Sequence, residues 1–227
     1  MAQSIALDGP AGAGKSTIAK RLAALLGLKY VDTGAMYRTL GLACTRRGVD
    51  ATKEEEVIPV LQTADIRVGY VGDTQHVYLD GEDVSTLIRT DEAGAMSSKV
   101  SVHPPVREKM VDMQRKLADE ISVIMDGRDI GTVVLPNAFL KIFLTASVEE
   151  RARRRRQDYL LQGKDKTQEE VEEEIRERDY RDSHREVGPL KQAEDAIRVD
   201  TTGLSIEQVV DTIRELYENR QKEAANA

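Results

Sequence analysis

Cysteine and tryptophan are almost absent from the chain. Its 227 residues include one cysteine, Cys44, no tryptophan and only two phenylalanines. A single cysteine cannot form an internal disulfide, so we expect a reducing compartment, the cytoplasm. Cys44 lies in an apolar stretch, which favours a small buried side chain over a nucleophile. With so few aromatic residues, the core is predicted to be aliphatic.

Long hydrophobic runs are also missing. No apolar segment approaches the roughly 20 residues that a membrane span requires, and the N-terminus lacks the basic and then apolar pattern of a signal peptide. The formal net charge is −7, which is unsuited to broad binding of nucleic acid or anionic membranes. We therefore expect small-molecule partners, no nucleic acid and no membrane, and a monomer, since no large apolar face is obvious.

What the sequence does contain is a glycine-rich loop near its start. Residues 9–17 read GPAGAGKST and fit the phosphate-loop pattern G-x-x-x-x-G-K-[ST]. A predicted buried strand, Ser4–Asp8, precedes the loop, and a predicted helix, Ile18–Leu26, follows it. Glycines let successive backbone N–H groups converge on phosphate oxygens, and the first turn of the helix adds its free donors.

This loop predicts a site for a nucleoside triphosphate. Lys15 can reach the β- and γ-phosphates, and the Ser16 hydroxyl can ligate Mg²⁺. The residues expected to bind the triphosphate are Gly9, Pro10, Ala11, Gly12, Ala13, Gly14, Lys15, Ser16 and Thr17.

Five short apolar segments separated by helical stretches predict an α/β fold, a parallel sheet with helices on both faces. The segments are Ser4–Asp8, Leu28–Asp32, Ser122–Asp126, Phe139–Leu144 and Ile197–Asp200. The other predicted helices are Ala35–Gly48, Val106–Glu120, Val148–Gln162, Gln168–Arg185 and one that begins after Ser205. After the first strand, which runs from Asp8 into the glycine loop, three more strands end in aspartate (Asp32, Asp126 and Asp200), at the edge where open α/β sheets bind ligands.

One segment interrupts the alternation of strands and helices. Ile66–Val71 and His76–Gly81 show period-two patterning around a turn, which predicts a hairpin, and residues 82–85 add a short third strand. We interpret residues 63–100 as an antiparallel subdomain inserted into a core of about 1–62 and 101–220. Its position suggests that it covers a substrate, and a surface hairpin without such a function is the alternative.

Arginine recurs where a second anionic ligand would lie. Arg38 and Arg128 follow predicted strand ends, and Arg178, Arg181 and Arg185 belong to a later helix. The planar guanidinium suits bidentate recognition of phosphate.

The only dense basic run, Arg151–Arg156, has three possible interpretations. It is a solvated face balanced by the acidic residues 169–174, a contact for nucleic acid, or a lid of about residues 151–167 that closes over triphosphate charge. No aromatic stripe accompanies the run, which disfavours nucleic acid. Gly163 and Lys164 would let such a segment move, and we favour the lid.

From Ile5 to about Leu216 the chain resembles the bacterial-type cytidylate kinases of the nucleoside monophosphate kinase group. The motifs that carry the resemblance are residues 9–17, Asp32-Thr33-Gly34-Ala35-Met36-Tyr37-Arg38, the hairpin ending in Gly81-Glu82-Asp83-Val84-Ser85, Ile88-Arg89-Thr90, Asp126-Gly127-Arg128-Asp129-Ile130-Gly131-Thr132, and Glu177-Arg178-Asp179 through Arg185. Thr33 stands where family members often have serine, and it keeps the hydroxyl.

The resemblance implies a single P-loop kinase domain over residues 1–227, with a five-stranded parallel sheet, an inserted NMP-binding subdomain and a helical lid. It implies transfer of the γ-phosphoryl group of ATP to CMP or dCMP with Mg²⁺ bound by Ser16. The implied catalytic residues are Lys15, Arg128, Arg154, Arg155 and Arg178. The implied substrate-binding residues are Thr33, Arg38, Ser98, Arg107, Arg128, Asp129, Arg178, Asp182 and Arg185.

Cytosine specificity would rest on the chemistry of Asp129. A carboxylate accepts from the cytosine N4 amine, whereas uracil presents an acceptor at the same place. The resemblance also places Ser98 and Arg107 near the base.

Three other functions remain open from the residues alone. The first is a kinase for another acceptor, such as UMP, AMP or a non-nucleotide alcohol. The second is a GTP-dependent switch, since Asp91-Glu92-Ala93-Gly94 fits D-x-x-G, although no N-K-x-D motif for guanine is present. The third is a nucleotide-dependent binding module without catalysis.

Overall fold

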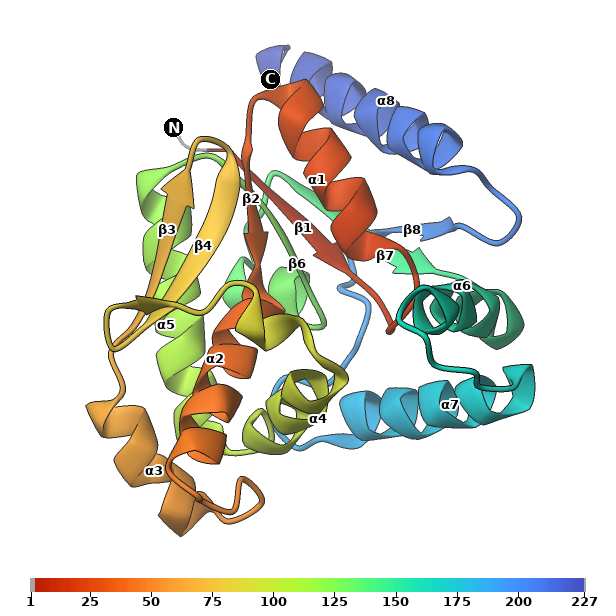
Figure 1. Cartoon of the computed structure of the whole chain (residues 1–227). Helices are drawn as coiled ribbons and strands as arrows, with labels where there is room; N and C mark the ends of the chain where they lie inside the picture. The colour runs from red at the N-terminus through yellow and green to blue at the C-terminus, as the bar shows by residue number, and fades with distance from the viewer. Residues whose placement is uncertain (1–2, 227) are drawn as a thin grey trace.

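A five-stranded parallel sheet forms the centre of the computed structural model, which describes residues 3–226 (Figure 1). In spatial order its strands are β2 (Lys29–Asp32), β6 (Val123–Gly127), β1 (Ser4–Asp8), β7 (Leu140–Thr145) and β8 (Ile197–Asp200). The predicted parallel sheet is confirmed, and each predicted strand end lies within one residue of the observed one. Because the carboxyl ends of all five strands lie at one edge, the loops that follow them share that edge.

Helices cover both faces of the sheet because successive strand residues point to opposite sides. Ile5 and Leu7 pack in one apolar cluster with α1 (Lys15–Leu26) and α8 (Ile206–Ala225), which lie side by side in Figure 1. Ala6 packs on the other face in a cluster that includes residues of α5 (Pro104–Glu120) and of a short π-helical segment, η2 (Ile130–Val134). Helix α2 (Thr33–Arg46) begins where β2 ends.

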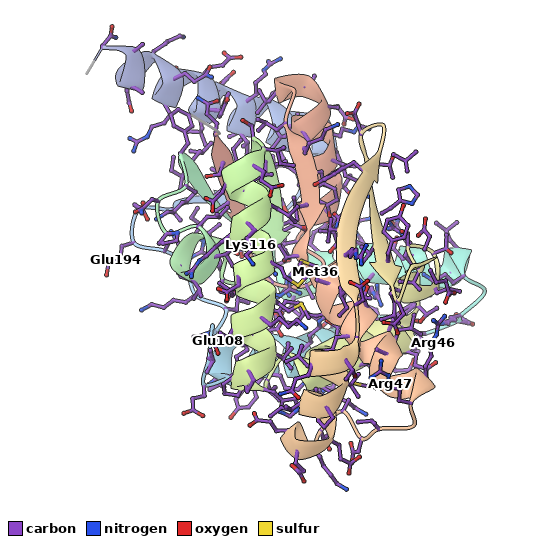
Figure 2. All side chains as sticks on the ribbon, turned by 90° about the vertical axis from the view of Figure 1, so that its left-hand side faces the viewer. Met36, Arg46, Arg47, Glu108, Lys116 and Glu194 are labelled. Carbon is purple, nitrogen blue, oxygen red and sulfur yellow. The ribbon has the colours of Figure 1, made fainter. Side chains whose placement is uncertain are left out.

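The segment between α2 and α5 contains the predicted antiparallel hairpin, which is confirmed. Its elements are α3 (Glu54–Thr63), β3 (Ile66–Val71), β4 (Thr74–Leu79), β5 (Glu82–Asp83), the 3₁₀ turn η1 (Leu87–Arg89) and α4 (Asp91–Val100). A third apolar cluster joins this segment to α2 and α5. Met36 and Cys44 are fully buried in it, whereas Glu108 and Lys116 of α5 lie on the exposed side (Figure 2).

Two α-helices of this segment, α3 and α4, are absent from the sequence prediction. The stretch Asp91–Gly94 forms the first turn of α4, and the Thr90 side chain caps the helix by accepting from the Ala93 N–H at 3.1 Å. The D-x-x-G pattern is therefore part of a capped helix, which speaks against the GTP-dependent switch.

Helices α6 (Val148–Leu161) and α7 (Gln168–His184) form a pair that we call the α6–α7 hairpin. Ala152 and Tyr159 of α6 pack with Val171 and Ile175 of α7 in a small apolar cluster of their own. Thr167 caps α7 with a capping box, so the connecting loop ends sharply. The predicted lid, residues 151–167, corresponds to most of α6 and this loop. Among the helices within residues 3–226, none has the length and apolarity needed to cross a membrane.

Candidate active site

A cleft of about 1140 Å³ opens at the carboxyl edge of the sheet, between the loop after β1, helix α4 and the α6–α7 hairpin. The structure brings nearly all the predicted site residues together around it. The predicted residues that line the cleft are Ala11, Gly12, Ala13, Gly14, Lys15, Ser16, Thr17, Thr33, Arg38, Ser98, Arg107, Arg128, Asp129, Arg154, Arg155, Arg178, Asp182 and Arg185. Gly9 and Pro10 belong to the same loop but do not line the cleft.

The loop between β1 and α1 has backbone geometry that only glycine adopts readily. Gly9 has φ 150° and passes so close to β7 that a Cβ would lie 2.0 Å from the Leu144 carbonyl oxygen. Gly14 has φ 89° and forms the N-cap of α1 without a side-chain cap, which leaves the N–H groups of the first turn free for an anion.

Lys15 is folded back onto this loop. Its Nζ donates to the Pro10 carbonyl oxygen at 2.8 Å, and the side chain is nearly buried. Burial lowers the pKa of Lys15 well below its ordinary value, and the positive charges of Arg128 and Arg178 lower it further. The ammonium group therefore gains more from a nearby anion than a solvated lysine would.

Asp126, at the end of β6, connects the loop to the start of α2. Its carboxylate accepts from the Ser16 hydroxyl at 2.7 Å and from the Tyr30 hydroxyl at 2.9 Å. Its carbonyl oxygen accepts from the Thr33 hydroxyl at 2.7 Å. Burial and the neighbouring charge of Asp32 raise the pKa of Asp126. Its place at a strand end is evident from the sequence, but these contacts are not.

Three arginines from different elements line the cleft together with Lys15: Arg38 of α2, Arg128 after β6 and Arg178 of α7. Arg38 Nη2 pairs with Asp32 at 2.6 Å, and Arg128 Nε pairs with Asp182 at 2.8 Å. Gly34 leaves room for Arg38, because a Cβ there would lie 2.9 Å from its guanidinium.

The third arginine, Arg178, has no such partner. Within residues 3–226 it forms no hydrogen bond or ion pair, and its Nε is buried without an acceptor. Burial and the positive charge of Arg128 lower the pKa of Arg178 to about 10. Arg38 Nε is buried and unpaired as well. A buried N–H donor without an acceptor destabilises the fold unless a ligand supplies the acceptor.

Farther along the cleft lies a buried acidic and basic cluster. Asp129 forms an ion pair with Arg107 and a longer one, 3.5 Å, with Arg185. The Arg107 guanidinium lies 5.7 Å from the centre of the Tyr37 ring. Ser98 also lines the cleft, and its hydroxyl donates to the Gly94 carbonyl oxygen of the same helix at 3.4 Å.

The arginines of α6 differ in their surroundings. Arg154 donates to the hydroxyl and carbonyl oxygens of Thr201 at 3.0 and 2.8 Å, whereas Arg155 reaches across the cleft to Asp91. Arg151 is buried and ties α6 to the Ala11 carbonyl oxygen at 3.1 Å. Arg151 is therefore an anchor of the helix, although the basic run gave no sign that it differs from its neighbours.

Asp8, the last residue of β1, has a structural role that its sequence context does not indicate. It is buried, and its carboxylate accepts from the backbone N–H groups of Ile130 and Gly131 at 2.8 and 2.7 Å. These bonds hold the start of η2, directly after Asp129. Burial raises the pKa of Asp8 to about 6, against the opposing effect of the two N–H donors.

The raised pKa makes a prediction about stability. The folded protein holds the Asp8 proton more tightly than the unfolded chain, so this contribution is complete below about pH 4 and is lost by about pH 6. The difference between the pKa of Asp8 in the folded protein and in the unfolded chain corresponds to about 3 kcal/mol. We expect the free energy of unfolding of the wild type, relative to Asp8→Asn, to fall by about this amount over that interval in urea titrations. A constant difference would contradict this. The control Asp200→Asn should show no such fall over this interval, because a hydrogen bond from Thr202 lowers the pKa of Asp200 and its contribution changes only below about pH 4.

Comparison with known proteins agrees with this geometry. A family model described as cytidylate kinase matches residues 5–219. A cytidylate kinase of Anoxybacillus flavithermus is 52% identical over 217 residues, which cover 96% of each chain. A cytidylate kinase of Bacillus subtilis is 50% identical over 219 residues, 96% of this chain and 98% of that one.

A solved structure with a similar fold is an uncharacterized protein from Eubacterium ventriosum. It has a TM-score of 0.54 and 13% sequence identity, and the match covers 96% of this chain and 99% of that one. The fold is thus shared well beyond recognisable sequence similarity. Since the family model and both relatives extend over nearly the whole chain, the protein belongs to the cytidylate kinase family.

Proposed function

We propose that the protein transfers the γ-phosphoryl group of ATP to CMP and to dCMP, giving the diphosphate. The family makes it a nucleoside monophosphate kinase that phosphorylates CMP with ATP as the donor. Use of the deoxy substrate, the metal and the roles of individual residues are our inferences from the site.

The proposal rests on a group of three arginines in the cleft that contains the phosphate loop. Arg38, Arg128 and Arg178 line the same cleft as Lys15, and Arg178 has no counter-ion among residues 3–226. An acceptor phosphate would supply the missing negative charge and hydrogen-bond acceptors. Donor and acceptor would then meet end to end between the loop and the arginines.

The donor triphosphate is assigned to the glycine loop. Residues 9–17 would bind its phosphates through backbone N–H groups, and Lys15 would exchange the Pro10 carbonyl oxygen for β- and γ-phosphate oxygens. Arg154 and Arg155 of α6 would offset the charge that develops during transfer. We assign the α6 and loop segment, residues 151–167, as the lid that excludes water.

The acceptor is assigned to the opposite side of the cleft, within reach of the inserted subdomain of residues 63–100. Arg38, Arg128 and Arg178 would hold its phosphate, and Asp182 would accept from a ribose hydroxyl. Thr33 would line the phosphate end. Arg128 already pairs with Asp182, so sugar and phosphate recognition are linked through one ion pair.

The buried cluster around Asp129 is assigned to the base. The Asp129 carboxylate would accept from the cytosine amine, with Arg107 and Arg185 fixing its orientation and Ser98 on the neighbouring helix. A uracil carbonyl at the same position would face a carboxylate without a proton between them. We therefore assign the preference for cytosine to Asp129.

The residues present fit a magnesium ion. Mg²⁺ prefers hard oxygen ligands and usually retains water and phosphate ligands alongside one or two protein groups. Ser16 offers a hydroxyl in the first turn of α1, and the Asp126 carboxylate lies 2.7 Å from it. The mutual repulsion of Asp126 and Asp32 would be relieved by a cation. When bound, Mg²⁺ would offset the charge of the phosphate oxygens.

The chemistry needs positioning more than a general base. An acceptor phosphate oxygen is already a nucleophile, and it forms a bond to the γ-phosphorus while the bond to the β–γ bridging oxygen breaks and ADP leaves. Arg38 and Arg128 would align that oxygen with the γ-phosphorus. None of the three histidines is assigned to catalysis. His103, for example, is buried outside the cleft, with its Nε2 atom 2.9 Å from the Ala51 carbonyl oxygen.

The proposal is tested by a substrate panel with coupled detection of ADP. We expect rapid transfer to CMP and dCMP, and kcat/KM for UMP lower by at least about tenfold, because an unpaired buried polar group disfavours the wrong base. Equal turnover on UMP would remove the role of Asp129. ADP release that is independent of any acceptor would instead indicate an ATPase, and no turnover at all would indicate a binding module.

A further inference from the structure

Asp91 connects the inserted segment to the α6–α7 hairpin. It is the first residue of α4, and it forms ion pairs with two residues of the hairpin. Arg155 Nη2 donates to Asp91 Oδ1 at 2.7 Å, and Lys164 donates to Oδ2 of the same carboxylate. In Figure 1, α4 points toward α7 across the lower part of the molecule. The contact therefore joins the segment assigned to the acceptor to the segment assigned to the donor.

The hairpin side of this contact is a cluster of positive charges around one aromatic ring. The Arg155 guanidinium lies 4.7 Å, Lys166 Nζ 4.6 Å and Lys164 Nζ 5.8 Å from the centre of the Tyr159 ring. Tyr159 is buried, and its hydroxyl donates to Glu174 of α7 at 2.9 Å. Three cations at one ring repel one another, so their arrangement depends on nearby carboxylates.

Two carboxylates balance these cations, and they come from different parts of the fold. Glu174 pairs with Lys166 within the hairpin itself. Asp91 pairs with the other two cations and belongs to α4. Partial burial opposes ionisation of Asp91, but the hydrogen bond from Lys164 and the charge of Arg155 outweigh it and hold the pKa of Asp91 below its ordinary value.

The contact leaves most of the Arg155 guanidinium free. Among residues 3–226, the hydrogen bonds of this guanidinium are made by Nη2 alone, to Asp91 and at 3.5 Å to the Tyr159 hydroxyl. The donors on Nε and Nη1 remain for another acceptor, and Arg155 lines the cleft. Asp91 can thus hold Arg155 in place while the arginine binds a phosphate oxygen.

We propose that Asp91 is a positioning residue that couples the acceptor site to the donor site through Arg155 and Lys164. When the acceptor draws the inserted segment inward, Asp91 moves with α4 and brings the α6–α7 hairpin over the donor triphosphate. Binding of CMP thereby strengthens binding of ATP. The inference rests on the proposed function of the cleft.

The ion pair between Asp91 and Arg155 contributes too little to the stability of the fold for stability to be its main effect. An ion pair between partly exposed side chains contributes little to folding, and Asp91 and Arg155 are 33% and 36% exposed. A contact between two segments that carry different ligands has a larger effect on coupling. Coupling between sites in proteins is typically 5- to 150-fold in affinity.

The test is isothermal titration calorimetry on the full chain with a non-hydrolysable ATP analogue, with and without saturating CMP. We expect CMP to lower the Kd of the analogue at least about fivefold in the wild type. In Asp91→Asn the ratio of the Kd without CMP to the Kd with CMP should fall to between about one and two. Asp91→Glu should restore most of the wild-type ratio. In kinetic assays at saturating CMP, Asp91→Asn should raise the KM for ATP several-fold with a smaller change in kcat.

The matched control is Glu92→Gln. Glu92 is the adjacent exposed carboxylate in the same first turn of α4, so its removal repeats the loss of negative charge near the helix N-terminus. It forms no ion pair among the residues that the structure describes. We expect wild-type coupling in this variant. Lys164→Gln provides a second variant in an exposed loop, where folding is not at risk, and it should weaken coupling in the same direction.

Unchanged coupling in both Asp91→Asn and Lys164→Gln overturns the inference, as does a wild type in which CMP has no effect on the analogue. In either case, normal phosphorylation of CMP by the wild type leaves the proposed function standing. Absence of CMP phosphorylation by the wild type overturns both.

Discussion

Lys15→Ala is expected to lower kcat for transfer from ATP to CMP by about 1000-fold or more. Lys15 is the one cation within the glycine loop itself, and charge stabilisation of this kind in a water-excluded site contributes several kcal/mol to the transition state. Among residues 3–226, the buried ammonium has the Pro10 carbonyl oxygen as its only hydrogen-bond acceptor. The measurement is steady-state kinetics with CMP and ATP both saturating.

The same substitution should not destabilise the fold. Lys15 lies in the repulsive field of Arg128 and Arg178, and burial already disfavours its charged form. We expect the midpoint of thermal unfolding to stay constant or rise. Arg21→Ala is the matched control, since Arg21 is on the same helix but exposed and paired with Glu207. Near-normal kinetics in Lys15→Ala would contradict the assignment of the loop.

The second large effect is expected at Arg178. Arg178→Met should lower kcat/KM for CMP by about 100- to 1000-fold, because we assign this guanidinium to the acceptor phosphate and it forms no ion pair with a carboxylate among residues 3–226. It should also raise the stability of the free protein, since burial and the charge of Arg128 work against a cation at this position. Activity and stability would then change in opposite directions.

Arg176→Met is the control for this experiment. Arg176 lies two residues earlier on α7 and pairs with Glu172 at 2.7 Å on the exposed side of the helix. We expect little change in either kinetics or thermal unfolding. A fall in both activity and stability in Arg178→Met would instead show that this arginine supports the fold.

The sheet and the phosphate loop could be predicted from the sequence because their signals are local. Apolar strands of four to six residues bounded by helices and a glycine loop in the right context need no knowledge of distant residues. Helix α3 escaped prediction because Pro59 lies in its middle, and a proline there argues against a helix. The helix is held by tertiary packing of Val57, Val60 and Leu61 into the cluster shared with α2.

Which residues line the cleft could also be predicted, but which of them form ion pairs could not. Patterns around Arg38, Arg128 and Arg178 indicated a second anion site. Arg38 pairs locally with Asp32, but the pairing of Arg128 with Asp182 depends on how α7 packs against the sheet, and that is a property of the whole fold. The same reason explains why Arg151 is an anchor while Arg155, one helical turn away, faces α4.

The position of Asp8 has a consequence for altering base preference. The chain runs directly from Asp8 into Gly9 of the glycine loop, while the Asp8 carboxylate fixes the two backbone N–H groups that follow Asp129. A mutagenesis library at residues 130 and 131 is therefore expected to lose many otherwise suitable variants, because a displacement of that backbone reaches the loop assigned to ATP through Asp8. Variation at Asp129, Arg107, Arg185 and Ser98, with Asp8 and residues 130–131 kept constant, offers the more productive route to a new pyrimidine specificity.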